Sequence, residues 1–255
     1  MITTATSPSV IDLPTIDLDE LIGRGSLLAR VDRKYALATA DAAMALELVD
    51  PTTTRVLQID GVQNLGYTSV YLDTAGLESF LLAARERRRR FKVRTRRYES
   101  NGASFLEVKT RFREQTIKHR LPGEHLTRGG FSETGARFVD ETLRGAGIRN
   151  PPVAGLVPSL RVDYRRVTLF HEPTASRVTI DTGLTWWDVR TGAWLSRPDL
   201  AIIETKSAGR PAGMDRLLWS LGHRPDRISK YGTALAAMHQ HLPSNKWRRT
   251  LKEHF

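Results

Sequence analysis

The chain has 255 residues, no cysteine, and a formal net charge of +11 from 39 Lys and Arg against 28 Asp and Glu. This length allows one large domain or two small ones, and the lack of cysteine excludes disulfides, thiol catalysis and thiolate metal sites. No apolar run reaches the roughly 18 to 20 residues that span a bilayer, and the N-terminus does not resemble a signal peptide. We therefore expect a cytoplasmic protein without direct membrane insertion, whose positive charge indicates a polyanionic partner.

The first third of the chain is predicted to alternate short strands with helices. Residues 1–16 are rich in Thr, Ser and Pro, which is typical of a flexible lead-in. In the first strand, Arg30, Asp32 and Lys34 fall on one face. The expected elements are a strand over Leu28–Leu37, a helix from Thr39 to about Leu48, strands over Arg55–Ile59 and Tyr67–Thr74, and a helix over about Leu77–Arg87.

The central stretch is predicted to form two neighbouring strands with one cationic face. In Phe91–Arg96 the even positions are Lys92, Arg94 and Arg96, a period of two that predicts a strand. After a turn at Ser100-Asn101-Gly102, the run Leu106–Phe112 repeats the pattern: Glu107, Lys109 and Arg111 share one face. The run Arg87–Arg90 lies at a helix–strand junction and is interpreted as a solvated face or a patch where a polyanion enters.

The second half of the chain continues the same pattern of charged strands. Arg161 and Arg165 fall on one face of the strand that follows Pro151-Pro152, and Arg166 falls on the apolar face unless a bulge shifts the register. The expected elements are a loop over Pro122–Arg128, a helix over Glu133–Leu143, strands over Ser159–Phe170, Ser176–Gly183 and Leu200–Lys206, and helices near Met214–Leu221 and Tyr231–Gln240.

Six of the roughly eight expected strands place charged residues in alternate register, which favours a closed antiparallel barrel with a polar interior. Like charges about 4 Å apart repel by roughly 4 kcal/mol at an effective dielectric constant of 20, so a ring of Arg and Lys needs a compensating polyanion. Phosphate chains fit, because Arg and Lys both bind phosphate oxygens. The carboxylates on these faces, Asp32, Glu107, Asp181 and Glu204, can hold Mg²⁺ or Mn²⁺ against phosphate. Glu107 is equally well explained as a structural partner of neighbouring Arg.

With these residues in view, the sequence resembles the VTC domain, the polyphosphate polymerase domain of the vacuolar transporter chaperone complex, in the CYTH-like triphosphate tunnel group. The resemblance extends from about Leu28 to His239. The segments that carry it are Arg30–Tyr35, Tyr71–Thr74, Lys92–Tyr98, Leu106–Lys109, Leu160–Arg166, Arg177–Thr182, Ile203–Lys206 and Ser229–Tyr231.

The resemblance implies an α+β fold in which an eight-stranded antiparallel β-barrel with flanking helices forms a triphosphate tunnel. It implies a single tunnel domain over residues 17–243, followed by a basic C-terminal tail over 244–255. The implied activity is that of a metal-dependent polyphosphate polymerase, a transferase that extends inorganic polyphosphate from ATP with manganese or magnesium. The implied catalytic residues are Lys34, Arg94, Arg96, Lys109, Arg161, Arg177 and Lys230; the further phosphate-binding residues are Lys92, Arg111, Arg165, Arg166 and Lys206; the metal ligands are Glu204, Glu107 and Asp181.

Two alternatives stay open. Hydrolytic tunnel enzymes carry two alternating glutamates on the first strand, where this chain has Arg30 and Asp32. That departure agrees with a polymerase and weakens the alternative of an inorganic triphosphatase. The second alternative is a non-catalytic module that binds polyphosphate. Nucleic acid is disfavoured as a partner, because the cations follow strands and no helix-turn-helix or aromatic RNA-binding signature is present. A membrane-protein partner is not identifiable from the sequence.

Overall fold

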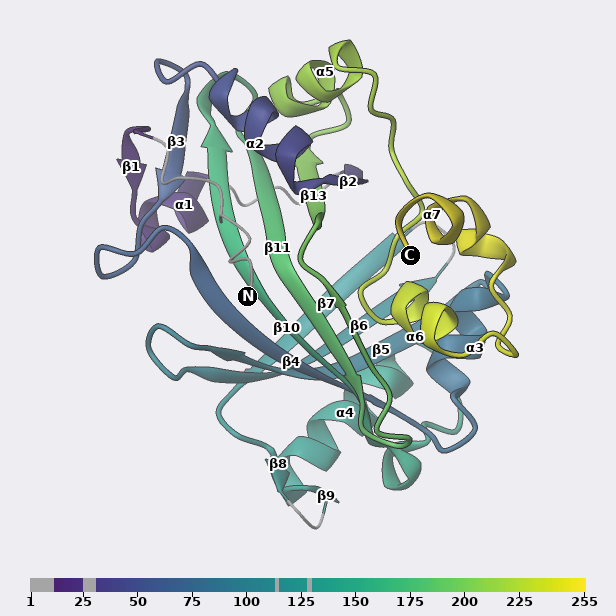
Figure 1. Cartoon of the computed structure of the whole chain (residues 1–255). Coiled ribbons are helices and arrows are strands. Elements are labelled where there is room, and N and C mark those ends of the chain that lie inside the picture. The colour runs from purple at the N-terminus through teal and green to yellow at the C-terminus, as the bar shows by residue number, and fades with distance from the viewer. Residues whose placement is uncertain (1–11, 25–30, 113–114, 128–129) are drawn as a thin grey trace.

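A strongly curled antiparallel sheet forms the body of the molecule (Figure 1). The computed structural model describes residues 12–24, 31–112, 115–127 and 130–255. Arg30 and the first eleven residues lie outside the described residues. The main path of the sheet contains eight strands, in the order β2 (Val31–Ala38), β13 (Leu200–Ser207), β11 (Ser176–Asp188), β10 (Val157–His171), β4 (Leu65–Asp73), β5 (Arg89–Tyr98), β6 (Ser104–Phe112) and β7 (Gln115–Pro122).

The α+β class and the eight-stranded antiparallel sheet with flanking helices are confirmed. The sheet curls into a half-barrel, and among the described residues no pairing joins its two ends, β2 and β7. The predicted strand over Arg55–Ile59 lies beside this path, whereas β7 had no predicted counterpart. The remaining strands are β1 (Thr15–Ile16), which pairs with β3 (Thr54–Leu57), β12 (Trp194–Arg197), which pairs with β11, and the hairpin of β8 (Leu126–Thr127) and β9 (Gly130–Phe131).

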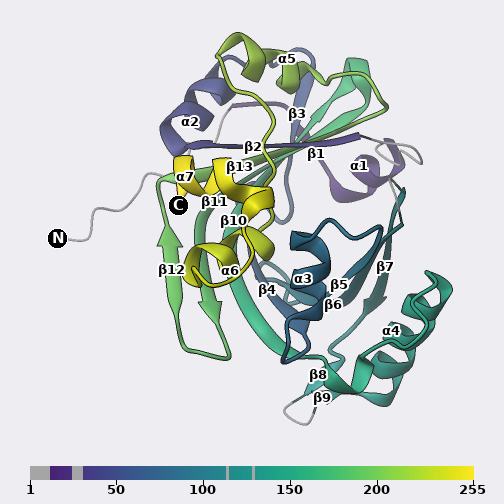
Figure 2. The same ribbon diagram turned by 90° about the vertical axis from the view of Figure 1, so that its right-hand side faces the viewer.

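Helices cover the sheet on three sides. On the outer face, α2 (Thr39–Glu47) and α5 (Gly213–Ser220) pack on β2 and β13, and α4 (Glu133–Gly145) packs on β6 and β7. At one end, α3 (Glu78–Ala84), α6 (Gly232–Met238) and α7 (Arg248–His254) lie between the two walls of the curled sheet (Figure 2). Helix α1 (Leu18–Arg24) lies near β3, and short 3-10 turns span Val153–Gly155, Glu172–Thr174 and Asn245–Trp247. None of the described helices is long and apolar enough to cross a membrane.

The segment predicted to be a basic tail packs against the core. Trp247 is only 2% exposed, and its ring lies 5.7 Å from that of Phe80 on α3. Leu251 and Phe255 pack against the same cluster of buried side chains. Burial of these apolar groups stabilises the helical end of the chain.

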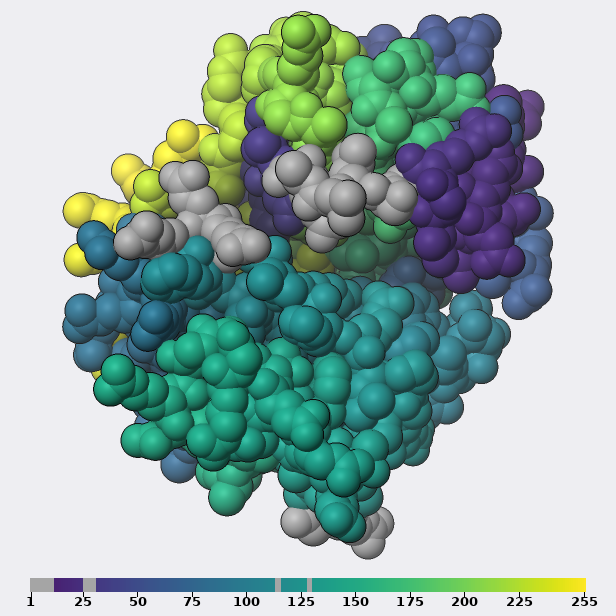
Figure 3. All heavy atoms as spheres, turned by 180° about the vertical axis from the view of Figure 1, so that it is seen from behind, coloured from purple at the N-terminus to yellow at the C-terminus, as the bar shows by residue number. Residues whose placement is uncertain are grey.

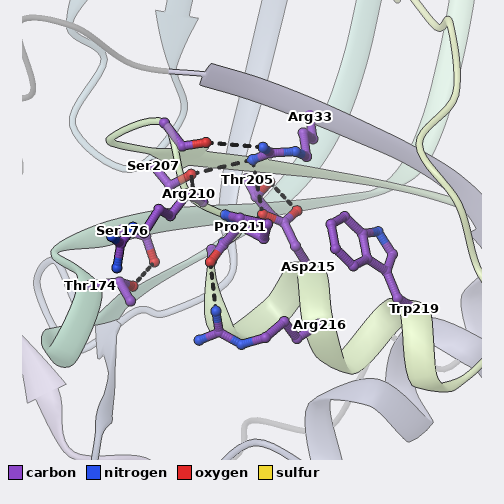
Figure 4. A network of polar contacts seen from close by, with 12 residues as sticks. Arg33, Thr174, Ser176, Thr205, Ser207, Arg210, Pro211, Asp215, Arg216 and Trp219 are labelled. Atoms are coloured by element: carbon purple, nitrogen blue, oxygen red, sulfur yellow. Dashed lines mark hydrogen bonds and ion pairs between the residues drawn. The ribbon is translucent and has the colours of Figure 1, made fainter.

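A buried carboxylate fixes α5 to the outer face of β2 and β13. Asp215 accepts hydrogen bonds from Tyr35 Oη (2.7 Å), Thr205 Oγ1 (2.6 Å) and the backbone amide of Ala212 (2.7 Å). It also pairs with Arg33 at 3.3 Å (Figure 4). Because side chains alternate along a strand, these contacts orient the opposite, inward face of β2 and β13.

A β-bulge at Gly183 sets which side chains of β11 face inward. Between Asp163 and Arg165 the register of β10 with β11 shifts by one residue, and Gly183 has a φ of +60°. The bulge places Trp186 and Asp181 on the same inward face, although they differ by an odd number of positions. Glycine adopts this φ without the steric cost that other residues bear.

We expect Gly183→Ala to lower the free energy of unfolding by about 1–2 kcal/mol, because an L residue is strained in the left-handed region. A Cβ atom at this position meets nothing within 4 Å, so the cost is conformational. Gly145→Ala is the matched control: its Cβ also meets nothing, and its φ is not positive. The free energy of unfolding of that variant should stay unchanged or rise slightly. Urea denaturation compares the two, and an equal loss in both would contradict a role for the bulge.

Candidate phosphate tunnel

Cationic side chains from both walls of the sheet face one shared interior. Lys109 on β6 interacts electrostatically with Lys34 on β2 and with Glu204 and Lys206 on β13, although these strands lie near opposite ends of the strand order. This proximity requires that the sheet folds back on itself. Seen from behind, the surface is hollowed between the half that carries α1 and the half that carries β5 to β7 (Figure 3). The predicted cationic face of β5 and β6 therefore lines the concave interior of the curled sheet.

Three tyrosine rings in this interior contact the guanidinium groups of arginines. Tyr67 and Tyr164 stack with ring centroids 5.3 Å apart, and Arg166 lies over both rings at 5.3 and 5.4 Å. Arg94 lies 5.6 Å from the ring of Tyr71 and donates a 2.9 Å hydrogen bond to its hydroxyl. Such contacts between a cation and a ring hold each guanidinium group in one orientation. We call Tyr67, Tyr71 and Tyr164 the tyrosine cluster.

Glu107, predicted as a metal ligand or a structural partner, is surrounded by cationic side chains and is 2% exposed. Its Oε2 pairs with Arg94 at 2.7 Å and lies 4.0 Å from Arg96, and its Oε1 accepts from Lys118 and, at 3.1 Å, from Arg120. Burial alone raises a carboxyl pKa, but Arg94, Arg96 and Lys118 hold the pKa of Glu107 well below its usual range. Both oxygens are engaged by cations, which favours the structural role that the sequence left open.

Asp181 is held in the same way by the opposite wall. Arg166 donates to its two oxygens at 2.5 and 2.8 Å, and Lys230, which precedes α6, donates to Oδ2. Although burial raises it, Arg166 and Lys230 lower the pKa of Asp181 to about 2. Asp181 therefore fixes two cations at the tyrosine cluster, and its oxygens are already engaged.

Of the three predicted metal ligands, Glu204 is the one whose carboxylate oxygens are not held closely by cationic side chains in the described part of the chain. Among the described residues its one ion pair is the 3.8 Å contact with Lys206. Burial raises its pKa, but Lys34, Lys206 and Lys109 hold the pKa of Glu204 well below the usual value, so the group is ionised at neutral pH. A carboxylate among lysines that do not bind it closely can still coordinate a cation.

Lysines on the two walls repel one another. Burial, followed by repulsion from Lys34, lowers the pKa of Lys109 to about 8, although Glu204 and Asp32 oppose this shift. The pKa of Lys92 is likewise held well below its usual value, by burial and by repulsion from Lys34 and Lys109. The Lys109 side chain nevertheless remains in contact with solvent.

The affinity for tripolyphosphate should fall as the pH rises through about 8, because Lys109 then loses its charge. In the unfolded chain this lysine stays protonated up to its ordinary pKa of 10.5. The unfolded state therefore binds more protons between about pH 8 and 10.5, and the ligand-free protein should gain stability in that window. Calorimetric titration from pH 7 to 9.5 measures the affinity. Lys109→Gln should flatten this part of the profile, and an unchanged profile in the variant would contradict the assignment.

Ten of the twelve predicted phosphate-site cations come from inward-facing positions, and two do not. Arg161 is 53% exposed and pairs with Asp163, and Arg165 donates to the backbone oxygen of Asn64 at 2.6 Å. The prediction that these two line the tunnel is corrected, and Arg166 is the inward residue. The reason is that the apolar face of β10, with Leu160 and Val162, faces inward where α6 fills the end of the tunnel. The ten inward residues are Lys34, Lys92, Arg94, Arg96, Lys109, Arg111, Arg166, Arg177, Lys206 and Lys230.

Buried hydrogen-bond donors also face this interior. Among the described residues, Arg96 Nε, Tyr164 Oη, Ser69 Oγ and Thr179 Oγ1 are buried without a hydrogen-bond partner. Each can donate a hydrogen bond, so the set fits an anionic ligand. Burial raises the pKa of Tyr164, but Arg96, Arg166 and Lys230 lower it overall, which indicates a strongly positive environment.

A divalent metal fits this interior only together with an anion. Within the described residues no three His, Asp or Glu side chains gather into a set that could hold a metal ion. Magnesium and manganese are often bound by one or two carboxylates plus substrate phosphates. Glu204 can supply one such ligand, and Asp32, on the neighbouring strand and near Lys109, lies on the same face.

The prediction missed two groups of residues that line the interior. Lys118 and Arg120 lie on β7, and the alternation of Thr116, Lys118 and Arg120 with Ile117 and Leu121 was the signal for that strand. The tyrosine cluster was also missed. Its signal was weaker, because tyrosine on a strand is usually explained by packing.

Comparisons with known proteins place these observations in context. A family model described as the VTC domain matches residues 30–239. No curated protein matches the chain. Among solved structures, a candidate adenylyl cyclase from Hippeastrum with a dominant triphosphatase activity is 13% identical, with 85% of this chain and 99% of that chain covered and a TM-score of 0.49. A candidate adenylate cyclase from Bacillus halodurans is 12% identical, with coverages of 79% and 94% and a TM-score of 0.49.

Proposed function

The chain belongs to the VTC domain family, and on that premise we propose that it is a metal-dependent polyphosphate polymerase. The reaction would transfer the γ-phosphate of ATP onto a growing chain of inorganic polyphosphate. The observation that carries the proposal is the convergence of ten predicted cations on one interior in which two of the carboxylates, Glu107 and Asp181, are already neutralised. Their remaining positive charge matches a string of phosphates better than any neutral substrate.

The chemistry asked of these residues is positioning and charge neutralisation. The terminal oxygen of the acceptor chain attacks the γ-phosphorus of ATP, the bond from that phosphorus to the β,γ-bridging oxygen breaks, and ADP leaves with the electron pair. A phosphate oxygen is already ionised, so the step needs no general base. Arg94, Arg96 and Arg166, held by the tyrosine cluster, would bind the equatorial oxygens.

Manganese or magnesium would be held by Glu204 and the substrate phosphates, with Asp32 as a further oxygen donor on the same face. A metal ion held there would supply charge neutralisation for the substrate phosphates. Lys34, Lys109 and Lys206 surround this position and would bind the same phosphates. Lys230 and Arg177 would bind phosphates farther along the tunnel.

Two other functions use the same tunnel. Hydrolysis of inorganic triphosphate would put water in the place of the acceptor chain, and a non-catalytic module would bind polyphosphate without turnover. Incubating the purified protein with ATP and Mn²⁺, and separately with tripolyphosphate and Mn²⁺, distinguishes them. Long chains resolved on a gel support the polymerase, phosphate release alone supports a triphosphatase, and binding without either product supports the module.

A further inference from the structure

Thr179 on β11 carries a buried hydroxyl that has no hydrogen-bond partner among the described residues. Its side chain faces the interior, because it lies two positions from the inward-facing Asp181 on the same strand. The residue is only 4% exposed, and its Oγ1 atom is shielded from solvent. Nearly all buried hydroxyl groups in folded proteins are hydrogen-bonded, so an unpaired one requires an explanation.

Glu204 on β13 is the direct cross-strand neighbour of Thr179 (Figure 1). Paired side chains on one face of an antiparallel sheet have Cβ atoms about 4.5–5.5 Å apart, so rotation of the longer Glu204 side chain can bring its carboxylate to the Thr179 hydroxyl. Among the described residues, the ion pair of Glu204 is the contact with Lys206 at 3.8 Å, which is too long for a hydrogen bond. An unpaired donor therefore lies beside a carboxylate that has no close donor in this part of the chain.

The other groups around Thr179 are less suitable acceptors. Asp181 already accepts hydrogen bonds at both oxygens, from Arg166 and from Lys230. Thr168, the neighbour of Thr179 on β10, has a neutral hydroxyl. A hydrogen bond to an ionised carboxylate is roughly twice as strong as one between neutral groups. Glu204 is therefore the acceptor that this arrangement favours.

We propose that Thr179 is a positioning residue for Glu204: its hydroxyl donates a hydrogen bond to one carboxylate oxygen and so directs the other oxygen toward a divalent metal ion on the substrate phosphates. Carboxylates that bind metals are themselves usually hydrogen-bonded, and loss of such a partner typically lowers metal affinity about 10–100-fold. The inference rests on the proposed function for the role of Glu204 as a metal ligand. It deepens that function by naming the residue that orients this ligand.

The test measures binding rather than turnover. Thr179→Val keeps the shape of the side chain and removes the hydroxyl, and Thr179→Ser restores it. Calorimetric titration measures the affinity for tripolyphosphate in excess Mn²⁺ and, separately, for metal-free tripolyphosphate in chelator. We expect Thr179→Val to weaken binding of the manganese form about tenfold and to change binding of the metal-free form by less than about twofold. Thr179→Ser should recover most of the lost affinity.

The stability of the ligand-free protein distinguishes positioning from a structural role. Thr179→Val removes a polar group that is buried without a partner, so the unfolding midpoint should stay unchanged or rise. A lower midpoint would mean that the hydroxyl stabilises the fold, and would overturn the inference. The matched control is Thr185→Val, the same change next to the inward-facing Trp186 and therefore on the outer face of β11. This control should bind both forms of tripolyphosphate like the wild type.

The two affinities also show how the inference can fail. Unchanged affinity of Thr179→Val for the manganese form would remove Thr179 from the metal site, and equal weakening of both forms would assign its hydroxyl to the phosphates instead. An equal loss in Thr185→Val would show that the effect does not depend on the position. Because neither measurement requires turnover, a protein that makes no polyphosphate refutes the polymerase, while the ratio of the two affinities still decides the role of Thr179.

Discussion

Glu204→Gln is expected to lower metal-dependent turnover of ATP by at least about 100-fold. The substitution keeps the size of the side chain but removes the one loosely held carboxylate of the interior that was predicted to bind metal. It also removes a negative charge from among Lys34, Lys109 and Lys206. Metal-free tripolyphosphate should therefore bind as tightly as before or more tightly, so that turnover and binding change in opposite directions. Steady-state rates across a manganese titration, with calorimetry in chelator, measure the two.

The control is Glu141→Gln on the exposed face of α4, which should match the wild type in both assays. A merely structural role for Glu204 would lower metal-free binding and turnover together. Full turnover in Glu204→Gln would remove this residue from the metal site.

Glu107→Gln should lower the free energy of unfolding of the ligand-free protein by about 3–5 kcal/mol, the usual cost of breaking a buried ion pair from one side. The neutral amide leaves Arg94, Arg96, Lys118 and Arg120 facing one another without their shared counter-charge. A bound polyanion can take over that role. Saturating tripolyphosphate should therefore raise the unfolding midpoint of the variant more than that of the wild type.

The pH dependence gives an independent check on Glu107. Its pKa in the folded protein lies well below that of the unfolded chain, so its contribution to stability is fully present above the unfolded value near 4.5 and is lost as the pH falls toward the folded value. Glu107→Gln should remove this component of acid destabilisation. Denaturant titrations at pH 7 and pH 4 measure the change in the free energy of unfolding. If Glu107→Gln loses as much stability as the wild type between pH 7 and pH 4, the neighbouring cations do not stabilise the ionised Glu107.

Alternation along single strands was enough to predict the cationic face of β5 and β6. Lys92, Arg94 and Arg96 share a face with a period of two, and β5 presents them to the interior opposite Lys109 and Glu107 of β6. The same rule applied to Thr116, Lys118 and Arg120 would have found β7. That run lacks the apolar density that usually marks a strand, because it lies at the edge of the sheet and has few buried neighbours.

What a single strand cannot reveal is which partner a side chain meets across the fold. The choice between Arg165 and Arg166 depended on α6 filling one end of the tunnel, which turns the apolar face of β10 inward. The engagement of Asp181 by Lys230 joins residues 49 positions apart in sequence. Glu107 and Asp181 were therefore predicted as metal ligands from their residue type, whereas their oxygens are bound by cations that only the tertiary structure brings near.

The tyrosine cluster has a consequence for how tightly a ligand can be held. A long arginine side chain normally loses several freely rotating torsions when it grips an anion, and that loss weakens association. Here Arg94 and Arg166 already rest on Tyr71, Tyr67 and Tyr164 before any ligand arrives. Arg94 and Arg166 therefore lose most of this conformational freedom during folding, and their guanidinium groups are already oriented when a phosphate binds.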